Sequence, residues 1–163
     1  MIRQFIPEEF CLKCQGCCRF HDTESIWSPN LLDTDIVGLL ENKILPFFIL
    51  GSKKLRLSWN QEQDSFTCSL LDISNNNCRA YSFRPFECQL YPFLINRRGN
   101  RVFLAVDLKC PFAEGNRESR HFKEYTRYLT DFFDSPELKK VLKENPQIIQ
   151  EYAQVVDLFP LNI

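Results

Sequence analysis

The sequence lacks the long apolar segments of membrane and secreted proteins. Its longest apolar run, "ILPFFIL" at 44–50, is far shorter than the roughly 18 residues that a membrane-spanning helix needs. The first residues, "MIRQFIPEEFCLKC", contain no apolar core of about 7 to 15 residues such as a signal peptide has. We therefore expect a cytoplasmic protein without a membrane partner.

The sequence also lacks an excess of charge of either sign. It has 163 residues, with 20 Lys and Arg, 21 Asp and Glu, and a formal net charge of -1. Because no basic excess is available to neutralise phosphates, we expect no nucleic-acid partner. A hydrophobic share of 44% and a charged share of 25% are typical of globular proteins, and the length fits a single domain over residues 1–163.

Glycine is scarce, with only five in the chain. No predicted strand is followed by a G-x-G-x-G-type loop, the element that binds nucleotide-derived cofactors in doubly wound folds. The sequence therefore gives little support for an adenosyl cofactor, and it neither identifies a catalytic residue nor decides whether the protein is an enzyme.

Cysteine, by contrast, is abundant. Four of the eight cysteines lie within "CLKCQGCC" at 11–18, and none follows position 110. A reducing cytoplasm keeps thiols free, so this clustering favours metal binding over a disulfide scaffold. Burial as small apolar side chains is the alternative for one or two of them. The candidate metal ligands are Cys11, Cys14, Cys17, Cys18, Cys68, Cys78, Cys88 and Cys110.

The spacing of the cysteines favours iron–sulfur binding, with zinc as the alternative cofactor. Zinc knuckles use two C-x2-C pairs, and no second pair is present here. Three cysteines at x2 spacing with a distant cysteine beside a proline are typical of bacterial ferredoxins, and Cys110 precedes Pro111. Because eight thiolates match two four-ligand centres, we expect an iron–sulfur protein with up to two centres.

We also predict how the thiols divide between two centres. The neighbouring side chains of Cys17 and Cys18 diverge, so they need not bind the same centre. The predicted ligand sets are Cys11, Cys14 and Cys17 with either Cys88 or Cys110, and Cys18, Cys68 and Cys78 with the remaining one.

The pattern of hydrophobic residues predicts an α+β fold, in which a small, irregular, cysteine-rich half with a β-hairpin packs against C-terminal helices. A helix is expected within 28–43, with Ser28 or Asn30 near its N-cap, and short strands and loops follow from Lys54. The apolar face predicted for this helix consists of Leu31, Leu32, Ile36, Leu39 and Leu40.

A β-hairpin is predicted over 91–107, with its strands joined by Arg98, Gly99 and Asn100, where the Gly-Asn pair suits a tight turn. Since an antiparallel hairpin returns to its starting end, we expect Cys88 and Cys110 to lie close together. A helical tail is predicted over 117–158, with helix starts at Ser135 and Asn145, each followed by a proline.

These motifs resemble the CxxCxxCC family of zinc- or iron-chelating proteins, also called the YkgJ-type cysteine cluster family. The resemblance covers about residues 11–112, and it includes Asp35 with Ile36 as the family's acidic step. Ala80 and Gln89 depart from the family pattern, and Gln89 stands where an arginine is usual. Further matching positions are Leu70, Leu71, Tyr81, Arg84, Pro85, Tyr91 and Pro92, besides the cysteines.

We expect Arg84 and Tyr91 to contact the cofactor, the first by balancing thiolate charge and the second as an aromatic wall with a polar tip. The function predicted first is a metal-cluster protein that acts in electron transfer or assists a redox enzyme, with a protein as its partner. A zinc-binding structural or interaction module is the second hypothesis. The family's association with flagellin lysine-N-methylase implies a third, a cluster-dependent protein lysine methyltransferase.

Overall fold

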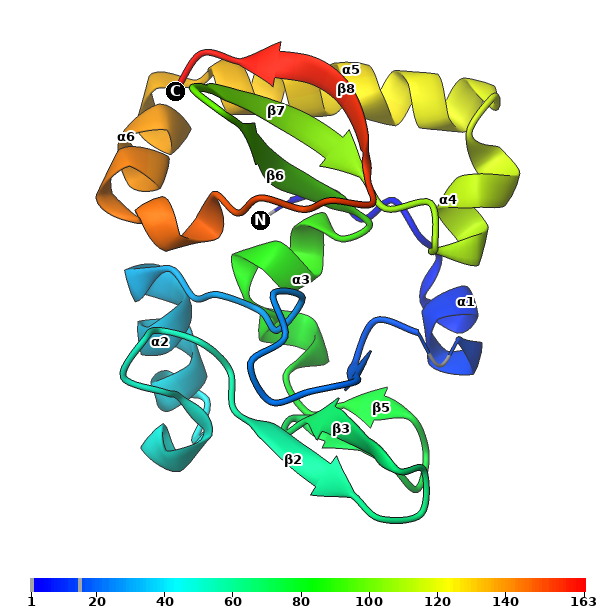
Figure 1. Ribbon diagram of the computed structural model, residues 1–163, viewed down its shortest axis with the longest axis vertical. Coiled ribbons are helices and arrows are strands. Elements are labelled where there is room, and N and C mark those ends of the chain that lie inside the picture. Colours follow the sequence, from blue (N-terminus) through cyan, green and yellow to red (C-terminus); the bar gives the residue numbers. More distant parts are fainter. Residues whose placement is uncertain (1, 15) are drawn as a thin grey trace. The chain divides into compact units, whose positions relative to one another are not determined.

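The computed structural model describes residues 2–14 and 16–163, and internal contacts divide the chain into two compact units. Unit 1 comprises Met1–Ile6 and Leu90–Ile163, and unit 2 comprises Pro7–Gln89. Both combine helices with small antiparallel sheets, so the predicted α+β class is confirmed (Figure 1). Whether the two units form the single domain predicted over 1–163 stays a prediction.

Unit 2 contains short elements joined by loops, as the alternating pattern and the polar turns after Lys54 predicted. Its three-stranded sheet has the order β1-β3-β2, and β4 and β5 form a separate antiparallel pair. The elements are α1 (Glu8–Lys13), β1 (Arg19–Phe20), α2 (Asp33–Glu41), η1 (Pro46–Phe48), β2 (Leu57–Asn60), β3 (Ser65–Cys68), β4 (Leu71–Asp72), β5 (Asn77–Cys78), η2 (Tyr81–Phe83) and α3 (Phe86–Leu90), whose last residue belongs to unit 1.

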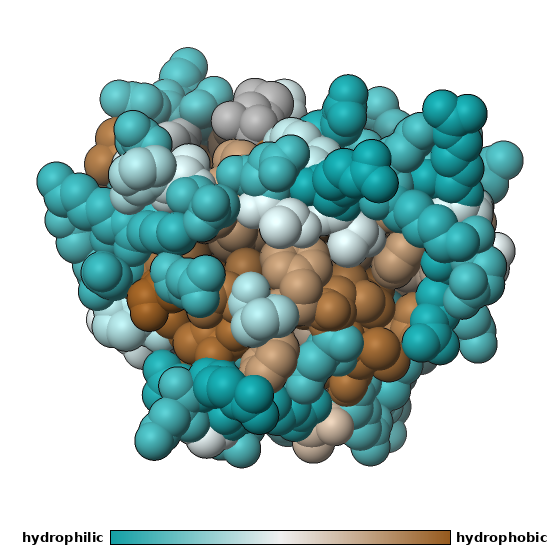
Figure 2. Space-filling view, turned by 90° about the horizontal axis from the view of Figure 1, so that it is seen from above, coloured by the Kyte–Doolittle hydropathy of each residue, from teal (hydrophilic) through white to brown (hydrophobic). Residues whose placement is uncertain are grey.

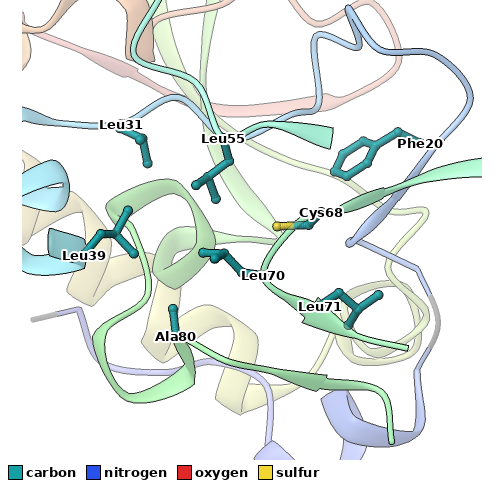
Figure 3. Packing of buried hydrophobic residues seen from close by; sticks show 8 residues of the cluster. All are labelled: Phe20, Leu31, Leu39, Leu55, Cys68, Leu70, Leu71 and Ala80. Atoms are coloured by element: carbon teal, nitrogen blue, oxygen red, sulfur yellow. The ribbon is translucent and has the colours of Figure 1, made fainter. Parts of the chain in front are cut away.

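The core of unit 2 is a cluster of leucines from separate segments, shown in Figure 3. Leu31, Leu39, Leu55 and Leu70 are almost completely buried, and Cys68 lies among them. Burying a leucine side chain contributes about 1.5–3 kcal/mol. One of the predicted metal ligands therefore belongs to the best-packed part of the unit.

The start of α2 corrects the sequence prediction. Its N-cap is Leu32 rather than Ser28 or Asn30, because the segment before it is extended: the Leu31 N–H donates to the carbonyl of Lys53 over 2.8 Å. The predicted apolar face is also too wide, since Leu40 is exposed while Leu39 is buried.

Unit 1 is built on the predicted hairpin. Arg98 pairs with Arg101, which leaves Gly99 and Asn100 as a two-residue turn, and Gly99 has the positive φ of 58° that such turns favour. The elements are β6 (Phe93–Arg98), β7 (Arg101–Val106), α4 (Pro111–Asn116), α5 (Arg120–Asp134), α6 (Pro136–Glu144), η3 (Pro146–Ile148) and β8 (Val156–Leu161).

Helix α5 packs on the sheet of unit 1 through aromatic side chains. The ring of Phe93 lies 5.5 Å from that of Phe122 and 5.2 Å from that of Tyr125, between centroids. Phe5, from the N-terminal segment, joins this group 5.3 Å from Phe93. Aromatic pairs at these separations add to the stabilisation that burial provides.

The prediction of a helix at the end of the tail is wrong. Helices α5 and α6 are present, and Ser135 caps α6, but only one short turn, η3, follows Asn145. The chain then forms β8, an antiparallel neighbour of β7. The buried side chain of Asn96 explains this course, since it donates to Asp157 over 2.7 Å and accepts the N–H of Tyr152 over 2.8 Å.

Strand β8 alternates between half-buried and exposed residues along most of its length.

Figure 2 views the molecule from above relative to Figure 1 and shows apolar side chains gathered within a rim of polar ones. Within the part of the chain that the structure describes, no helix has both the length and the apolar character to cross a membrane.

Candidate metal centre

The first cysteine group begins on a short helix. Cys11 lies in α1, and Cys14 follows the last residue of that helix, where its N–H donates to the carbonyl oxygens of Phe10 and Cys11 over 3.0 and 3.1 Å. Cys18 directly precedes β1. Cys11, Cys14 and Cys18 are half-buried, whereas the Cys17 residue is exposed as a whole.

The second group comes from three separate elements of unit 2. Cys68 ends β3, Cys78 ends β5 and Cys88 lies in α3. The two groups are joined through the main chain, because the N–H of Cys68 donates to the carbonyl of Cys18 over 3.0 Å. The fold therefore brings residues about fifty positions apart in sequence into adjacent backbone positions.

Four thiols share one electrostatic environment. Burial is the first cause that raises the pKa of Cys88 well above its usual range, and the thiols of Cys68, Cys78 and Cys17 raise it further. Burial likewise raises the pKa of Cys68 to about 12, with added contributions from Cys78 and Cys17. These four side chains are close enough to oppose each other's ionisation, so a metal must displace protons to bind them.

Cys17 is the member of this set that comes from the first group. A hydrogen bond with the Cys18 side chain is the leading cause that raises its pKa, and burial of the thiol comes second although the residue as a whole is exposed. We predicted that Cys17 belongs with Cys11 and Cys14, whereas the thiols that interact with it electrostatically are Cys18, Cys68, Cys78 and Cys88. The coupling favours a different grouping, and the ligand sets themselves stay a prediction.

Arg84 supplies positive charge to these thiols. Its guanidinium lies over the ring of Tyr81, 4.1 Å from the centroid, and it lowers the pKa of both Cys17 and Cys78 against the larger effects that raise them. The predicted charge-balancing residue therefore lies where thiolate charge would form.

Tyr91 and Cys110 belong to unit 1. The hydroxyl of Tyr91 donates to a carboxylate oxygen of Asp107 over 2.9 Å, so in this structure it supports the end of the hairpin. Cys110 is buried at the N-cap of α4. A cofactor contact by Tyr91, and closeness of Cys110 to Cys88, which lies in unit 2, stay predictions.

Two carboxylates that sequence reasoning did not place at the centre secure the helix that carries Cys88. Asp35 accepts the N–H groups of Leu32 and Phe86 over 2.8 and 3.0 Å. Glu87 accepts the N–H of Asn30 over 2.6 Å, and burial raises its pKa to about 8. The sequence signals that could have indicated these roles were the position of Glu87 next to Cys88 and the place of Asp35 in the acidic step of the family resemblance.

The match to known families covers the region of these cysteines. A family model described as "Putative zinc- or iron-chelating domain" (CxxCxxCC) matches residues 10–111, which include all eight cysteines. The chain belongs to the CxxCxxCC family. Neither a curated protein nor a solved structure matches it. Membership confirms the resemblance and supports a metal-binding role for the chain.

The donor chemistry of the chain fits the metals of its family. All eight cysteines lie among the described residues, and thiolates are the ligands that zinc and iron–sulfur centres take. Among residues 2–14 and 16–163, however, no three His, Cys, Asp or Glu side chains are already placed to hold one ion. Metal binding therefore requires the coupled thiols to turn toward each other.

Proposed function

We propose that the cysteine-rich unit binds an iron–sulfur centre and that the protein transfers electrons or assists a redox enzyme in the cytoplasm. The observation that carries the proposal is the gathering of Cys17, Cys68, Cys78 and Cys88, from four separate segments, near enough to affect one another's ionisation, within a region that matches a zinc- or iron-chelating domain. Iron–sulfur clusters commonly take four thiolates, and the C-x2-C-x2-C spacing together with eight cysteines exceeds what one tetrahedral zinc needs.

The chain itself would contribute ligands, positive charge and a surrounding of low polarity. A bound cluster would supply one-electron chemistry, at a potential that depends on nearby charges and on solvent exposure. Arg84 would favour the more negative, reduced state, because it is positively charged and already interacts with two of the thiols. Burial of Cys68 and Cys88 would limit access of water on their side of the centre.

Anaerobic purification followed by metal analysis tests the proposal. We expect a brown protein with several irons and matching sulfide per chain, broad absorption near about 400 nm and an EPR signal on reduction. A colourless protein with stoichiometric zinc and no iron would rule out this function.

A structural zinc site is the second candidate, because the four coupled thiols also match the number of ligands in a closed tetrahedral site. The strands of unit 2 have only two to four residues, so a metal would supply stability that the sheets do not. A zinc chelator should then unfold unit 2 while the signal of α5 and α6 persists. An unchanged far-ultraviolet circular dichroism spectrum after zinc release would exclude it.

The methyltransferase hypothesis has less support. The described strands pair only in antiparallel ladders, unlike the parallel sheet of doubly wound cofactor-binding folds. Calorimetric titration of the metal-loaded protein with S-adenosylmethionine tests it directly, and absence of binding would remove it.

A further inference from the structure

Asn76 lies in the turn between β4 and β5, two residues before Cys78. Its backbone has a φ of 59°, in the left-handed region that asparagine and glycine adopt more readily than other residues. The sequence "NNN" at 75–77 predicted only a turn here. In the structure, the middle asparagine points its amide away from its own turn and toward the first cysteine group.

The amide of Asn76 bonds to both sides of the cysteine loop. Its Nδ2 donates to the carbonyl of Leu12 over 2.8 Å and to that of Cys14 over 2.9 Å. Its Oδ1 accepts from the guanidinium of Arg19 over 3.0 Å. Leu12 and Cys14 precede the loop and Arg19 follows it, so one side chain fixes the entrance and the exit of the segment that holds Cys17 and Cys18.

We propose that Asn76 is a positioning residue of the metal centre, which holds the segment that carries Cys17 and Cys18 against the hairpin that carries Cys78. The inference rests on the proposed metal-binding function. Ordering a loop costs roughly 1–2 kcal/mol of backbone entropy per residue. Hydrogen bonds that form without metal meet part of this cost in advance, so the ligands need less ordering when the metal arrives.

The chemistry of the position explains why an amide is needed. Aspartate has nearly the same shape and tolerates a positive φ, but it cannot donate, and its carboxylate would face the carbonyls of Leu12 and Cys14. Glycine would keep the backbone conformation and lose all three bonds. Asn75 provides a matched control, because it is exposed and its side chain bonds only within the same turn, to Asp72 and Asn77.

The experiment compares wild-type protein with Asn76→Asp, Asn76→Gly and Asn75→Asp, each prepared without metal. Zinc affinity is measured by competition with a chromophoric chelator, and cobalt is added to record the thiolate-to-cobalt absorption. Thermal unfolding of the metal-free proteins and the alkylation rates of Cys14 and Cys17, measured by mass spectrometry, are recorded in parallel.

We expect both Asn76 variants to lose about 10- to 100-fold in zinc affinity, the range typical of residues that orient ligands. Their thiolate-to-cobalt absorption should weaken and Cys14 should be alkylated faster, whereas Asn75→Asp should resemble the wild type. If Asn76→Asp does not fold, the zinc affinity of Asn76→Gly alone tests the positioning role. Wild-type affinity in the Asn76 variants would overturn the positioning role only, while a wild-type protein that binds neither zinc, cobalt nor iron would overturn the proposed function together with it.

Discussion

The backbone N–H of Cys68 and the carbonyl of Cys18 are hydrogen-bonded over 3.0 Å. This bond extends the pairing of β1 with β3, in which Arg19 faces Thr67 and Phe20 faces Phe66. The two cysteine groups are therefore joined by main-chain hydrogen bonds, which do not depend on a metal. The backbone positions of Cys18 and Cys68 are therefore set by strand pairing.

Replacing Cys68 by alanine should reduce bound metal, because this thiol is coupled to three of the other candidates. We expect at least one centre to be lost and the free energy of unfolding of the metal-free protein to fall by about 1 kcal/mol, since a buried sulfur is removed from the core. Thr67→Val, at the buried neighbouring position, leaves every thiol in place and should keep the metal. Full metal content in Cys68→Ala, measured by mass spectrometry, would show that Cys68 is not a ligand.

Arg84 should raise the reactivity of the thiols near it. In Arg84→Met, the pKa of Cys17 and Cys78 should rise further, because the positive charge that lowers both is gone. Alkylation of these thiols by iodoacetamide in metal-free protein at mildly alkaline pH should therefore slow, since the thiolate reacts. Arg79→Met removes a charge that lowers the pKa of Asp72 and serves as the control. Equal rates in both variants would contradict the assignment.

Asp35 should give the protein a pH-dependent stability. Burial raises its pKa from 3.8 to about 6, so the folded state binds a proton more tightly than the unfolded state does. Asp35 therefore adds to the free energy of unfolding below about pH 4, and this stabilisation is lost as the pH rises through about 6. In Asp35→Asn, urea unfolding should show a smaller fall in stability between pH 4 and 7 than in wild type. Thr34→Ala, at an exposed position of the same helix end, removes no titratable group and should keep the wild-type slope.

Two glycines should respond to alanine in opposite directions. Gly99 has a φ of 58°, and alanine there should lower the free energy of unfolding by about 1 kcal/mol. Gly38 lies within α2, where an added Cβ would meet no atom within 4 Å, so Gly38→Ala should raise it by up to about 1 kcal/mol. Denaturant unfolding of both variants measures the two changes in the free energy of unfolding. Changes of the same sign would contradict the expected opposite effects of the turn and the helix.

Asn96 should be essential for the return strand of unit 1. Asn96→Ala removes the bonds to Asp157 and to the N–H of Tyr152 and leaves buried polar groups without their partner, at a cost of about 1–3 kcal/mol. Limited proteolysis should then cut between Ile149 and Val156, ahead of β8. Asn100→Ala, in the exposed turn, should resist cleavage there as the wild type does.

Local signals were sufficient for several elements. The Gly99 and Asn100 turn and the Ser135 cap each depend on neighbours in sequence, and the structure confirms both. The clustering of the first cysteines indicated metal binding, which the family match supports without distinguishing iron–sulfur from zinc. The prediction of a helical tail failed after Pro146, because the residues that follow have an apolar spacing compatible with a helix. Their strand forms only because β7 and Asn96, fifty or more positions earlier, offer partners.

The grouping of the thiols was beyond sequence reasoning for a similar reason. The tertiary fold brings Cys17 near Cys68, Cys78 and Cys88, which lie in two strands and a helix, and no spacing rule encodes that proximity. The contributions of Asp35 and Asn76 likewise depend on which backbone groups the fold brings to them. Polar side chains that bond to distant main-chain groups leave little trace in a single sequence.

Unit 1 is discontinuous, with Met1–Ile6 separated from Leu90–Ile163 by the whole of unit 2. In the order of synthesis, seven of the eight cysteines precede the first strand of the later hairpin. The ring contacts of Phe5 with Phe93 and Phe122 can form only after those two residues have been synthesised. The residues of unit 2 are therefore all synthesised before unit 1 can complete its core, so unit 2 can begin to fold on its own contacts while unit 1 still lacks its sheet.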